Sequence, residues 1–378
     1  LQRPLTLEEL ETPALLVDAA RLRRNLEGMA RLAAQSGTRL APHAKSHKSP
    51  ALGRLQLESG AVGLCTAKVS EAAVFAESGF EDLLVAYPVV GPKAEALAEL
   101  AARHPHTRFA AAADSETGVA HLARAAVARG VTLGLWLEVD GGLHRTGLAP
   151  RDPALAALAR RAREAKGVRL AGLLTHAGHA YQAAPGEIPA IGRAEGVDLV
   201  AAARALSAAG LGPLRVSLGS TPTLPFSARV EGVDEIHPGV YVFGDRQQIS
   251  LGAMRPDDVS LTVLATCVSR PAPGRWVLDA GSKTLSSDRG AHGSEAVRGF
   301  GRLRPVSGHR APDVARPLPF VSFGQGPGSE TGEAPRVSAG SRAGSDSADA
   351  ALLTRLSEEH GVVERDRELD LGPGDRVE

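Results

Sequence analysis

The stretch from Asp82 to Ala113, DLLVAYPVVGPKAEALAELAARHPHTRFAAAA, contains one complete repeat of the pattern that decides the fold. A short apolar run begins at Asp82, an alanine- and leucine-rich stretch follows from Pro92 to Arg103, and a second apolar run begins at Arg108. Apolar runs of this length predict buried strands, and the stretch between them has the length and composition of a helix. A strand, a helix and a second strand in this order predict a parallel pair with a helical crossover.

The same repeat extends over most of the chain. Eight strand-and-helix units are present, and they predict an α/β fold with a (β/α)8 barrel. Several of the predicted helices, among them 92–103, 115–129 and 152–166, open with Ser, Asp or Pro, which favour helix starts. The predicted strands begin near Thr38, Gly63, Asp82, Arg108, Thr132, Leu170, Arg215 and Glu235.

A second domain is predicted outside the barrel. One further strand, 14–18, and a helix, 19–35, precede the barrel, and the helical period disappears after about Gln247. The segments SLTVLATCV (260–268) and RWVLDAG (275–281) predict antiparallel strands. We therefore expect a barrel over 20–246 and a β domain formed by 1–19, including the first strand, and 247–378. The Gly/Ser-rich stretch 324–350 predicts a mobile surface loop.

Composition and charge exclude several classes of protein. The chain has 378 residues, with 43 basic and 43 acidic side chains, and no long basic run. This balance argues against nucleic acid or an acidic membrane as a partner and favours a small-molecule site. Its two cysteines, Cys65 and Cys267, form neither a disulfide framework nor a cysteine zinc motif. With no apolar run of about 20 residues, we expect a soluble cytoplasmic protein.

Polar residues follow several of the predicted strands, at the end of the barrel where this fold carries its chemistry. These segments are Pro42–Lys48 (PHAKSHK), Asp140–Gly147 (DGGLHRTG), His176–Tyr181 (HAGHAY), Gly219–Thr223 (GSTPT) and His237–Tyr241 (HPGVY).

Lys45 is conspicuous because the chain contains only six lysines among its 43 basic residues. A lysine amine can lose its proton and attack a carbonyl, which an arginine cannot do. Gly219, Ser220 and Thr221 offer backbone N–H groups and two hydroxyls, and the loops after strands seven and eight commonly bind phosphate in this fold. A reactive lysine and a phosphate loop together predict pyridoxal 5'-phosphate as the cofactor.

Simpler interpretations stay open for individual residues. Lys45 alone fits a solvated loop lysine, and Gly219–Pro222 alone fits a turn. Lys48 and Lys68 are weaker candidates for the reactive amine. His176 and His179 can satisfy buried polar groups or act as acid or base. For the pair of histidines in the PHAKSHK segment we expect positioning roles rather than metal binding.

These motifs, in this order, resemble the pyridoxal-phosphate enzymes of the alanine-racemase fold type (fold type III), in the branch of D-threonine aldolase and D-serine dehydratase. The resemblance runs nearly end to end. Besides the segments above, it rests on Thr12–Ala14, Pro238–Asp245, Asp279–Lys283 and Ser357–Gly361.

The resemblance implies a role for each candidate residue. Lys45 bonds to the cofactor, and Arg145 and Tyr181 approach the cofactor ring or the substrate. His179 is a candidate base, with a metal-bound water as the alternative. Family members form head-to-tail homodimers. The residues implied to surround the phosphate are Gly219, Ser220, Thr221, Gly239 and Tyr241.

Two positions depart from the family pattern. Residue 41 is Ala where the family usually has Arg before Pro-His. The family also carries a metal-binding His-x-Cys or His-x-Asp shortly after a Gly-Asp-x-Val segment, and the sequence stops at Gly374–Glu378, within that segment. We expect a divalent metal, Mn, Mg or Zn, if the natural chain continues. Its ligands are unknown, and we do not reassign the metal to His360.

The resemblance implies a lyase. The leading expectation is metal-assisted retro-aldol cleavage of a D-β-hydroxy amino acid such as D-threonine, giving glycine and an aldehyde. The alternative is D-serine dehydration to pyruvate and ammonia. A non-catalytic pyridoxal-phosphate carrier is disfavoured because about 130 residues follow the barrel. A racemase is disfavoured because all three tyrosines, Tyr87, Tyr181 and Tyr241, lie within the predicted barrel.

Overall fold

The structure, a computed structural model, describes residues 5–294, 297–304, 306, 351–367 and 369–378. These residues form two compact units, one built from 24–242 and the other from 5–23 with the described residues from 243 onward. The predicted Gly/Ser-rich loop, 324–350, lies outside the described residues. None of the described helices combines the length and the apolar character that crossing a membrane requires.

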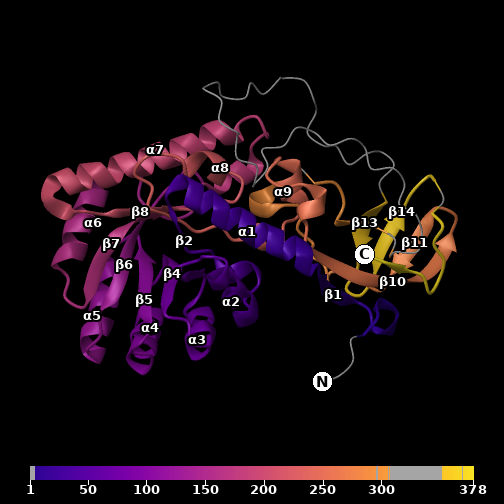
Figure 1. The fold of residues 1–378 in the computed structure, drawn as a ribbon, viewed down its shortest axis with the longest axis horizontal. Helices are drawn as coiled ribbons and strands as arrows, with labels where there is room; N and C mark the ends of the chain where they lie inside the picture. The colour runs from indigo at the N-terminus through magenta and orange to yellow at the C-terminus, as the bar shows by residue number, and fades with distance from the viewer. Residues whose placement is uncertain (1–4, 295–296, 305, 307–350, 368) are drawn as a thin grey trace. The chain divides into compact units, whose positions relative to one another are not determined.

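An eight-stranded parallel sheet with helices confirms the predicted barrel fold (Figure 1). Its strands follow one another in the order β2-β9-β8-β7-β6-β5-β4-β3. They are β2 (Arg39–Leu40), β3 (Leu64–Thr66), β4 (Asp82–Pro88), β5 (Arg108–Ala113), β6 (Leu133–Val139), β7 (Val168–Thr175), β8 (Arg215–Leu218) and β9 (Glu235–Ile236). Each predicted strand corresponds to one of them.

The two ends of this sheet, β2 and β3, meet and close the barrel. An isolated parallel bridge joins His43, just after β2, to Cys65 of β3. The N–H of Cys65 donates to the carbonyl of Pro42 (2.9 Å), and the N–H of Val62 donates to the carbonyl of Leu40 (2.8 Å). The PHAKSHK segment therefore lies at the seam of the barrel.

The helices begin and end at residues that suit those positions. The Ser115 hydroxyl accepts from the N–H of Gly118 at the start of α5, and α5 ends at Gly130, which adopts a left-handed conformation (φ 65°). Asp152 caps α6 in the same way, ahead of Pro153. The helices are α1 (Ala19–Ser36), α2 (Pro50–Glu58), α3 (Val69–Glu77), α4 (Pro92–Arg103), α5 (Glu116–Arg129), α6 (Pro153–Glu164), α7 (Ile188–Leu206), α8 (Leu224–Ser227) and α9 (Arg246–Ser250).

Consecutive strands contribute to a buried layer inside the barrel. Trp136 is the largest of these residues, and the guanidinium of Arg215 lies 4.7 Å from the centre of its ring. Such stacking adds a cation–π attraction to the packing. The buried members of the layer are Ala41, Cys65, Leu84, Ala112, Trp136 and Leu174.

The second unit contains an antiparallel sheet, as predicted from the sequence. The first strand of the chain joins it, since β1 pairs with β10 from Ala14 opposite Leu264 to Val17 opposite Leu261. The sheet follows the order β1-β10-β11-β14-β13-β12, with β15 paired to β10. Its strands are β1 (Ala14–Val17), β10 (Leu261–Ala272), β11 (Arg275–Leu278), β12 (Gly301–Arg302), β13 (Leu352–Leu356), β14 (Gly361–Glu364) and β15 (Arg376–Val377).

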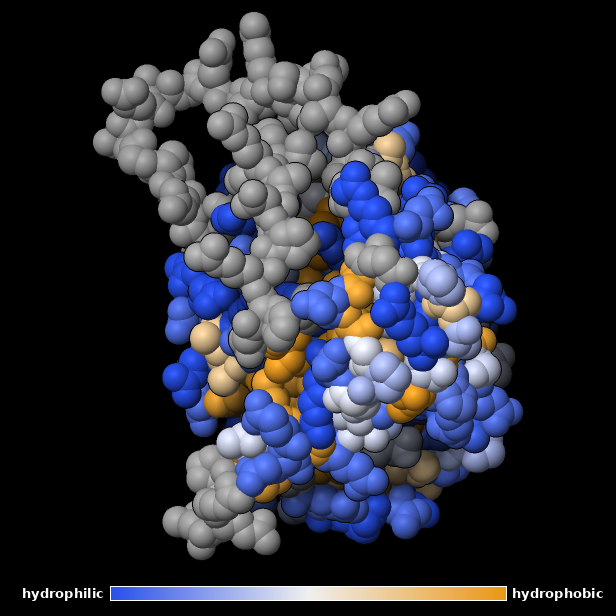
Figure 2. Space-filling view, turned by 90° about the vertical axis from the view of Figure 1, so that its right-hand side faces the viewer, coloured by the Kyte–Doolittle hydropathy of each residue, from blue (hydrophilic) through white to orange (hydrophobic). Residues whose placement is uncertain are grey.

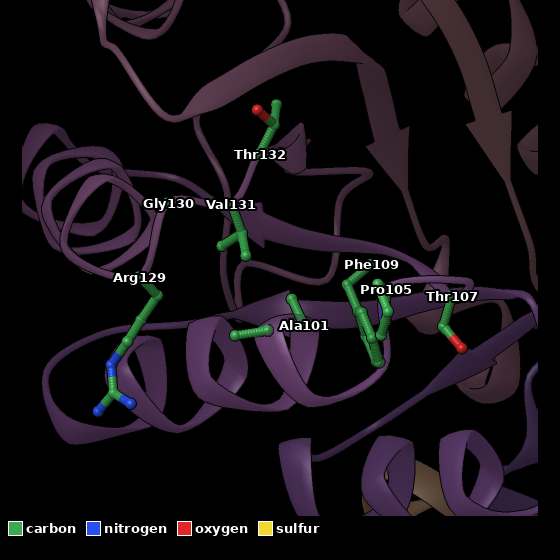
Figure 3. Close-up of a pocket in the computed structure, with 9 residues that line it drawn as sticks. Ala101, Pro105, Thr107, Phe109, Arg129, Gly130, Val131 and Thr132 are labelled. Atoms are coloured by element: carbon green, nitrogen blue, oxygen red, sulfur yellow. The ribbon is translucent and has the colours of Figure 1, made fainter.

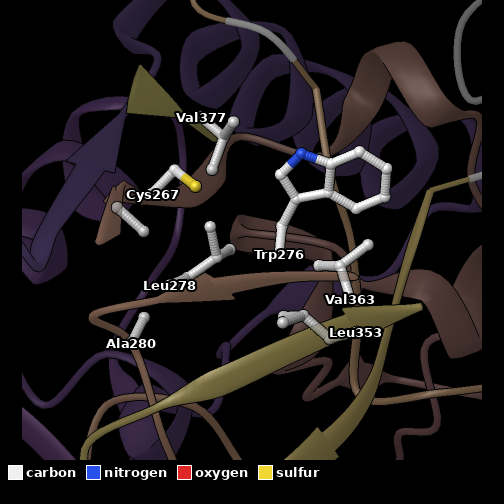
Figure 4. Packing of buried hydrophobic residues seen from close by; sticks show 8 residues of the cluster. Cys267, Trp276, Leu278, Ala280, Leu353, Val363 and Val377 are labelled. Atoms are coloured by element: carbon white, nitrogen blue, oxygen red, sulfur yellow. The ribbon is translucent and has the colours of Figure 1, made fainter. Parts of the chain in front are cut away.

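Trp276 occupies the core of this unit (Figure 4). It is fully buried against residues that include Cys267, Leu353 and Val363, and its indole N–H donates to the carbonyl of Leu371 (2.8 Å).

Some apolar side chains remain outside the core, among them Val268 of β10, which is 45% exposed. Figure 2 likewise shows hydrophobic residues reaching the surface between hydrophilic ones on the face that it views.

We expect Trp276→Ala to destabilise the second unit by about 3–5 kcal/mol, because it leaves a cavity and an unpaired Leu371 carbonyl. Val268→Ala, on the same sheet, should change its stability by less than about 0.5 kcal/mol. Differential scanning calorimetry of both variants tests this expectation. Equal shifts in the melting temperature would contradict the assignment of Trp276 as the centre of this core.

Candidate active site

The residues singled out in the sequence follow the carboxyl ends of the parallel strands. Lys45 lies after β2, Arg145 after β6, and His176 directly after β7. Gly219 directly follows β8, and His237 directly follows β9. Because parallel strands of a barrel present their carboxyl ends on one rim, these side chains share the same end of the barrel.

Hydrogen bonds and close contacts join the loops at this end. The Ser46 hydroxyl donates to the carbonyl of Gly239 (2.9 Å), and a ring nitrogen of His176, Nδ1, is bonded to the carbonyl of Gly219. A Cβ atom at Gly219 would lie 2.6 Å from Cδ2 of His237, so only glycine fits there. The loops after β2, β7, β8 and β9 thus form one connected wall.

The environment of Lys45 favours its neutral amine. Burial lowers the pKa of Lys45, and the nearby Arg145 guanidinium lowers it further, whereas Glu71 and Glu138 act in the opposite direction. The residue nevertheless keeps solvent-exposed surface. An amine surrounded by protein atoms and still open to solvent lies in the mouth of the barrel, where a ligand can reach it.

The other two candidate lysines lack this environment. Lys48 forms an ion pair with Glu71 (3.4 Å), and Lys68 is exposed at the start of α3. Lys45, in contrast, is the candidate whose pKa burial lowers. Lys45 therefore stays the predicted reactive amine.

Three neutral imidazoles surround Lys45. Burial lowers the pKa of His43, of His176 (to about 3) and of His237 (to about 4), and the positive charge of Lys45 lowers each of them further. His237 is also bonded through Nδ1 to the Ser217 hydroxyl (2.9 Å). These histidines act near pH 7 as uncharged hydrogen-bonding groups.

Two buried hydroxyls of the Gly219–Thr223 loop have no hydrogen-bond partner among the residues that the structure describes. The side-chain oxygens of Ser220 and Thr221 are both in this state, and each residue is only 1% exposed. Buried polar groups are normally hydrogen-bonded, because leaving one unpaired costs about 1–3 kcal/mol. Unpaired hydroxyls in a loop at this end of the barrel fit a site for an anionic ligand.

The hydroxyl of Thr223, in the same loop, is paired. It donates to the Glu195 carboxylate on α7 (2.8 Å) and also lies 3.0 Å from the Ser220 carbonyl. Glu195 accepts a second hydrogen bond from the N–H of Ala177 (3.0 Å), in the loop after β7. Burial raises the pKa of Glu195 to about 7, against the lowering effect of these hydrogen bonds.

The loop that carries Arg145 is held by Asp140. One carboxylate oxygen accepts the N–H groups of Gly142 and His144 (2.9 and 3.0 Å), and the other is 2.6 Å from Nδ1 of His144. Partial burial raises the pKa of Asp140, but these hydrogen bonds outweigh it and lower the pKa overall. They also hold His144 at a positive φ of 57°, a strained conformation for a residue other than glycine.

His179 and Tyr181 lie in the short helical segment Gly178–Gln182 after β7. Nδ1 of His179 is buried and has no hydrogen-bond partner in the described part of the chain, and burial lowers its pKa. A Cβ at Gly142 would lie 2.8 Å from the His179 ring, which places this ring against the Arg145 loop. The Tyr181 ring is buried, 6.1 Å from the ring of His176.

Tyr241 is held by a chain of hydrogen bonds that runs through Gln56 to His47. The Gln56 amide donates to the Tyr241 hydroxyl (3.0 Å), and its oxygen is 3.1 Å from Nε2 of His47. Burial raises the pKa of Tyr241, so its hydroxyl stays protonated and can donate to a further acceptor. The His47 bond agrees with the positioning role expected for this histidine.

Sequence reasoning missed three polar residues of this site. Glu138, inside β6, bonds the Thr146 hydroxyl, and its other oxygen is buried and unpaired among the described residues. Gln56 lies on α2 and Glu195 on α7. A carboxylate within the apolar strand TLGLWLEV was a usable signal for Glu138, whereas nothing in the helix sequences distinguishes Gln56 or Glu195 from surface residues.

One open cavity lies at the opposite end of the barrel (Figure 3). It has a volume of about 420 Å³ and lies among Phe109 near the start of β5, Arg129 at the end of α5 and Thr132 before β6. The Arg129 guanidinium is paired with Glu99 (3.2 Å). Because chemistry in this fold gathers at the other end, we assign no catalytic role to the cavity.

A metal site is not apparent in the described residues. They contain no group of three or more His, Cys, Asp or Glu side chains that could hold an ion. The metal expected from the resemblance therefore stays a prediction, and we route no chemical step through it.

Comparison with known proteins agrees with this geometry. The chain is 34% identical to D-threo-3-hydroxyaspartate dehydratase of Delftia sp. over 81% of both chains, and 32% identical to D-threonine aldolase of an Arthrobacter species over 83% of this chain and 86% of the aldolase. The solved structure of the Delftia dehydratase has a TM-score of 0.83 and 31% identity, covering 98% of this chain and 90% of that one. A variant of that dehydratase has also been solved in a metal-free form.

Family models cover almost the whole chain. The model of the alanine racemase N-terminal domain matches residues 17–247, and that of a putative serine dehydratase domain matches residues 260–378. The chain therefore belongs to the family that carries the alanine racemase N-terminal domain. It is a pyridoxal-phosphate-dependent lyase with the alanine-racemase fold, which confirms the resemblance noted in the sequence.

The residues present in this lyase fit pyridoxal phosphate. Unpaired hydroxyls at Ser220 and Thr221 suit its phosphate, and the lowered pKa of Lys45 suits a bond to its aldehyde. Both features lie at the carboxyl ends of the strands.

We expect the hydroxyls of the Gly219–Thr223 loop to differ in how much they contribute to the stability of the ligand-free protein. Ser220→Ala and Thr221→Val remove unpaired groups, so each should leave the free energy of unfolding within about 0.5 kcal/mol or increase it. Thr223→Val leaves the Glu195 carboxylate short of a donor and should cost about 1–3 kcal/mol. Thermal melts of the ligand-free variants measure this difference, and a large loss for Ser220→Ala would show that its hydroxyl has an internal partner.

Proposed function

We propose that this lyase cleaves a D-3-hydroxy amino acid by a retro-aldol reaction, giving glycine and an aldehyde. One observation carries the proposal: a lysine of lowered pKa and two unpaired buried hydroxyls occur at the same end of one barrel. The names of two relatives support the substrate class, because D-threonine and D-threo-3-hydroxyaspartate both carry a hydroxyl on the β-carbon.

Phosphate binding is assigned to the loops after β8 and β9. The Ser220 and Thr221 hydroxyls would donate to the phosphate oxygens, together with the backbone around Gly219 and Gly239. Tyr241 would contribute its own hydroxyl proton, because the Gln56 amide already supplies the hydrogen bond that the Tyr241 oxygen accepts. Hydroxyls and backbone N–H groups are the usual donors to a phosphate at this position of the fold.

Lys45 is assigned the covalent attachment of the cofactor, because a neutral amine attacks an aldehyde carbonyl. Pyridoxal phosphate, when bound, withdraws electrons from the bonds of the substrate α-carbon. The Arg145 guanidinium, which adds to the effect of burial in lowering the pKa of Lys45, would ease the loss of a proton from that amine and would contact the cofactor ring or the substrate.

His179 is assigned the removal of the β-hydroxyl proton. Its lowered pKa leaves the imidazole neutral at pH 7, and Nδ1 has no competing partner within the described chain. A base positioned on this proton contributes about 10²–10⁴-fold to the rate of such reactions. Tyr181, buried beside His176, would pack against the cofactor or the substrate.

Dehydration of the same substrate class is a second candidate. It is supported by the Delftia relative, which is a dehydratase, and by the match of residues 260–378 to a putative serine dehydratase domain. This reaction requires removal of the α-proton, and the Lys45 amine is the group suited to accept it. D-Serine would then give pyruvate and ammonia.

Two further properties are proposed, one from the family resemblance and the other from the sequence. We propose a head-to-tail homodimer and a cytoplasmic location. Analytical ultracentrifugation of the purified protein tests the first.

Replacement of Lys45 by Ala should abolish the visible absorption band that a lysine-bound pyridoxal phosphate gives. Lys48→Ala is the matched control, because Lys48 lies three residues away and is paired with Glu71. It should keep the band. Persistence of the band in Lys45→Ala would reject Lys45 as the attachment site.

Product analysis decides between the two reactions. The protein, supplied with pyridoxal phosphate and a divalent cation, is incubated with D-threonine, and the products are identified by mass spectrometry. Glycine with acetaldehyde supports the aldolase proposal, whereas 2-oxobutyrate with ammonia supports dehydration. L-Threonine serves as the control and should give neither set of products.

A further inference from the structure

Glu195 is a buried carboxyl group that the proposed reaction does not use. It lies on α7, is 5% exposed, and accepts the N–H of Ala177 at one oxygen and the hydroxyl of Thr223 at the other. One side chain therefore joins the loop after β7 to the loop after β8. The first of these loops contains His176 and His179, and the second contains the unpaired hydroxyls.

In the described part of the chain, Glu195 has no positively charged partner. On its own helix, Arg193 is exposed and lies over the Phe226 ring, 6.0 Å from its centre. On the loop after β7, His176 is neutral because burial lowers its pKa to about 3. After α8, Arg229 is exposed. An uncompensated buried carboxylate is costly, and burial accordingly raises the pKa of Glu195 to about 7.

The geometry around Thr223 accommodates either protonation state of Glu195. A hydroxyl has one proton to donate, and two acceptors lie within reach, Glu195 Oε2 at 2.8 Å and the Ser220 carbonyl at 3.0 Å. When Glu195 is ionised, Thr223 donates to it. When Glu195 is protonated, its O–H can donate to Thr223, and Thr223 then donates to the Ser220 carbonyl. Glu195, the Thr223 hydroxyl and the Ser220 carbonyl are each paired in both arrangements.

A phosphate bound by this loop would favour one of the two arrangements. The phosphate of the cofactor carries about two negative charges at neutral pH. An ionised Glu195 behind the loop would repel it, and a low dielectric strengthens that repulsion. A protonated Glu195 removes the repulsion and keeps the hydrogen bonds between the loops.

We propose that Glu195 is a positioning residue that takes up a proton when the Gly219–Thr223 loop binds a phosphate group, so that phosphate binding and protonation of Glu195 favour one another. This inference rests on the proposed function, because it assigns the loop to the cofactor phosphate. By linkage, the affinity for a phosphorylated ligand falls as pH rises through the range in which Glu195 ionises.

The test uses pyridoxamine 5'-phosphate, which lacks the aldehyde and cannot bond to Lys45. Its dissociation constant is measured by calorimetry between about pH 6.5 and 8.5, in buffers of different ionisation enthalpy, so that proton uptake is obtained directly. Pyridoxamine without the phosphate is the ligand control. Glu195→Gln is the matched variant, because its amide oxygen can still accept from Ala177 and its NH₂ can donate to Thr223, as protonated Glu195 does.

We expect the affinity of the unmutated protein to fall about 3–10-fold more across this range than that of Glu195→Gln, since a pKa change of one unit corresponds to about tenfold in affinity. The unmutated protein should take up more protons on binding than the variant. Pyridoxamine should show no difference between the two proteins. Identical pH dependence and identical proton uptake would overturn the inference while leaving the proposed cofactor site intact.

A second variant keeps the inference testable if Glu195→Gln fails to fold. Thr223→Val removes a donor to the ionised carboxylate, so Glu195 should stay protonated to higher pH and the fall in affinity should move upward by about one pH unit. A fall at unchanged pH would count against the inference. If the unmutated protein fails to bind pyridoxamine 5'-phosphate at every pH, the proposed cofactor site itself is wrong, and the inference is rejected with it.

Discussion

Closure of the parallel sheet between His43 and Cys65 is the constraint on which the candidate site depends. Although β2 is only two residues long, pairing with both neighbouring strands continues as far as His43, within the PHAKSHK segment. Lys45 is therefore held two residues from the closing bridge. The loop after β9 meets the same segment through the hydrogen bond of Ser46 to Gly239, and Gly219 joins the loops after β7 and β8 to the loop after β9. A barrel left open at this seam would have no fixed place for the amine.

The electrostatics of the site follow from its burial. Burial lowers the pKa of Lys45, and burial together with the charge of Lys45 lowers the pKa of His176 and His237, so these imidazoles are uncharged at pH 7. Neutral nitrogen atoms can accept protons, which is the capacity that lyase chemistry needs. In Glu195, beside the Gly219–Thr223 loop, burial instead raises the pKa to about 7, so this carboxyl keeps its proton to a higher pH than usual. Burial thus lowers the pKa of the bases and raises the pKa of the acid at the same end of the barrel.

Much of this could be predicted from the sequence, because the informative signals are local. The eight strands appear as short apolar runs, and Lys45 is recognisable as a rare residue after a strand in a chain rich in arginine. The Gly219–Thr223 loop was recognisable as a candidate phosphate loop from its glycine and hydroxyl residues. In contrast, Gln56 and Glu195 occupy ordinary positions on helices, and their importance comes from partners far away in the chain. Tyr241 lies 185 positions from Gln56, and no sequence period connects them.

The unpaired hydroxyls of Ser220 and Thr221 also bear on how long the protein survives without its cofactor. A ligand that pairs them stabilises the folded state by mass action, by about 2.7 kcal/mol at a concentration one hundred times its dissociation constant. The ligand-free form lacks this increment, so a larger fraction of it is unfolded at any moment and open to proteolysis. Cofactor supply would then govern the abundance of the enzyme as well as its activity, through degradation of the molecules that remain empty.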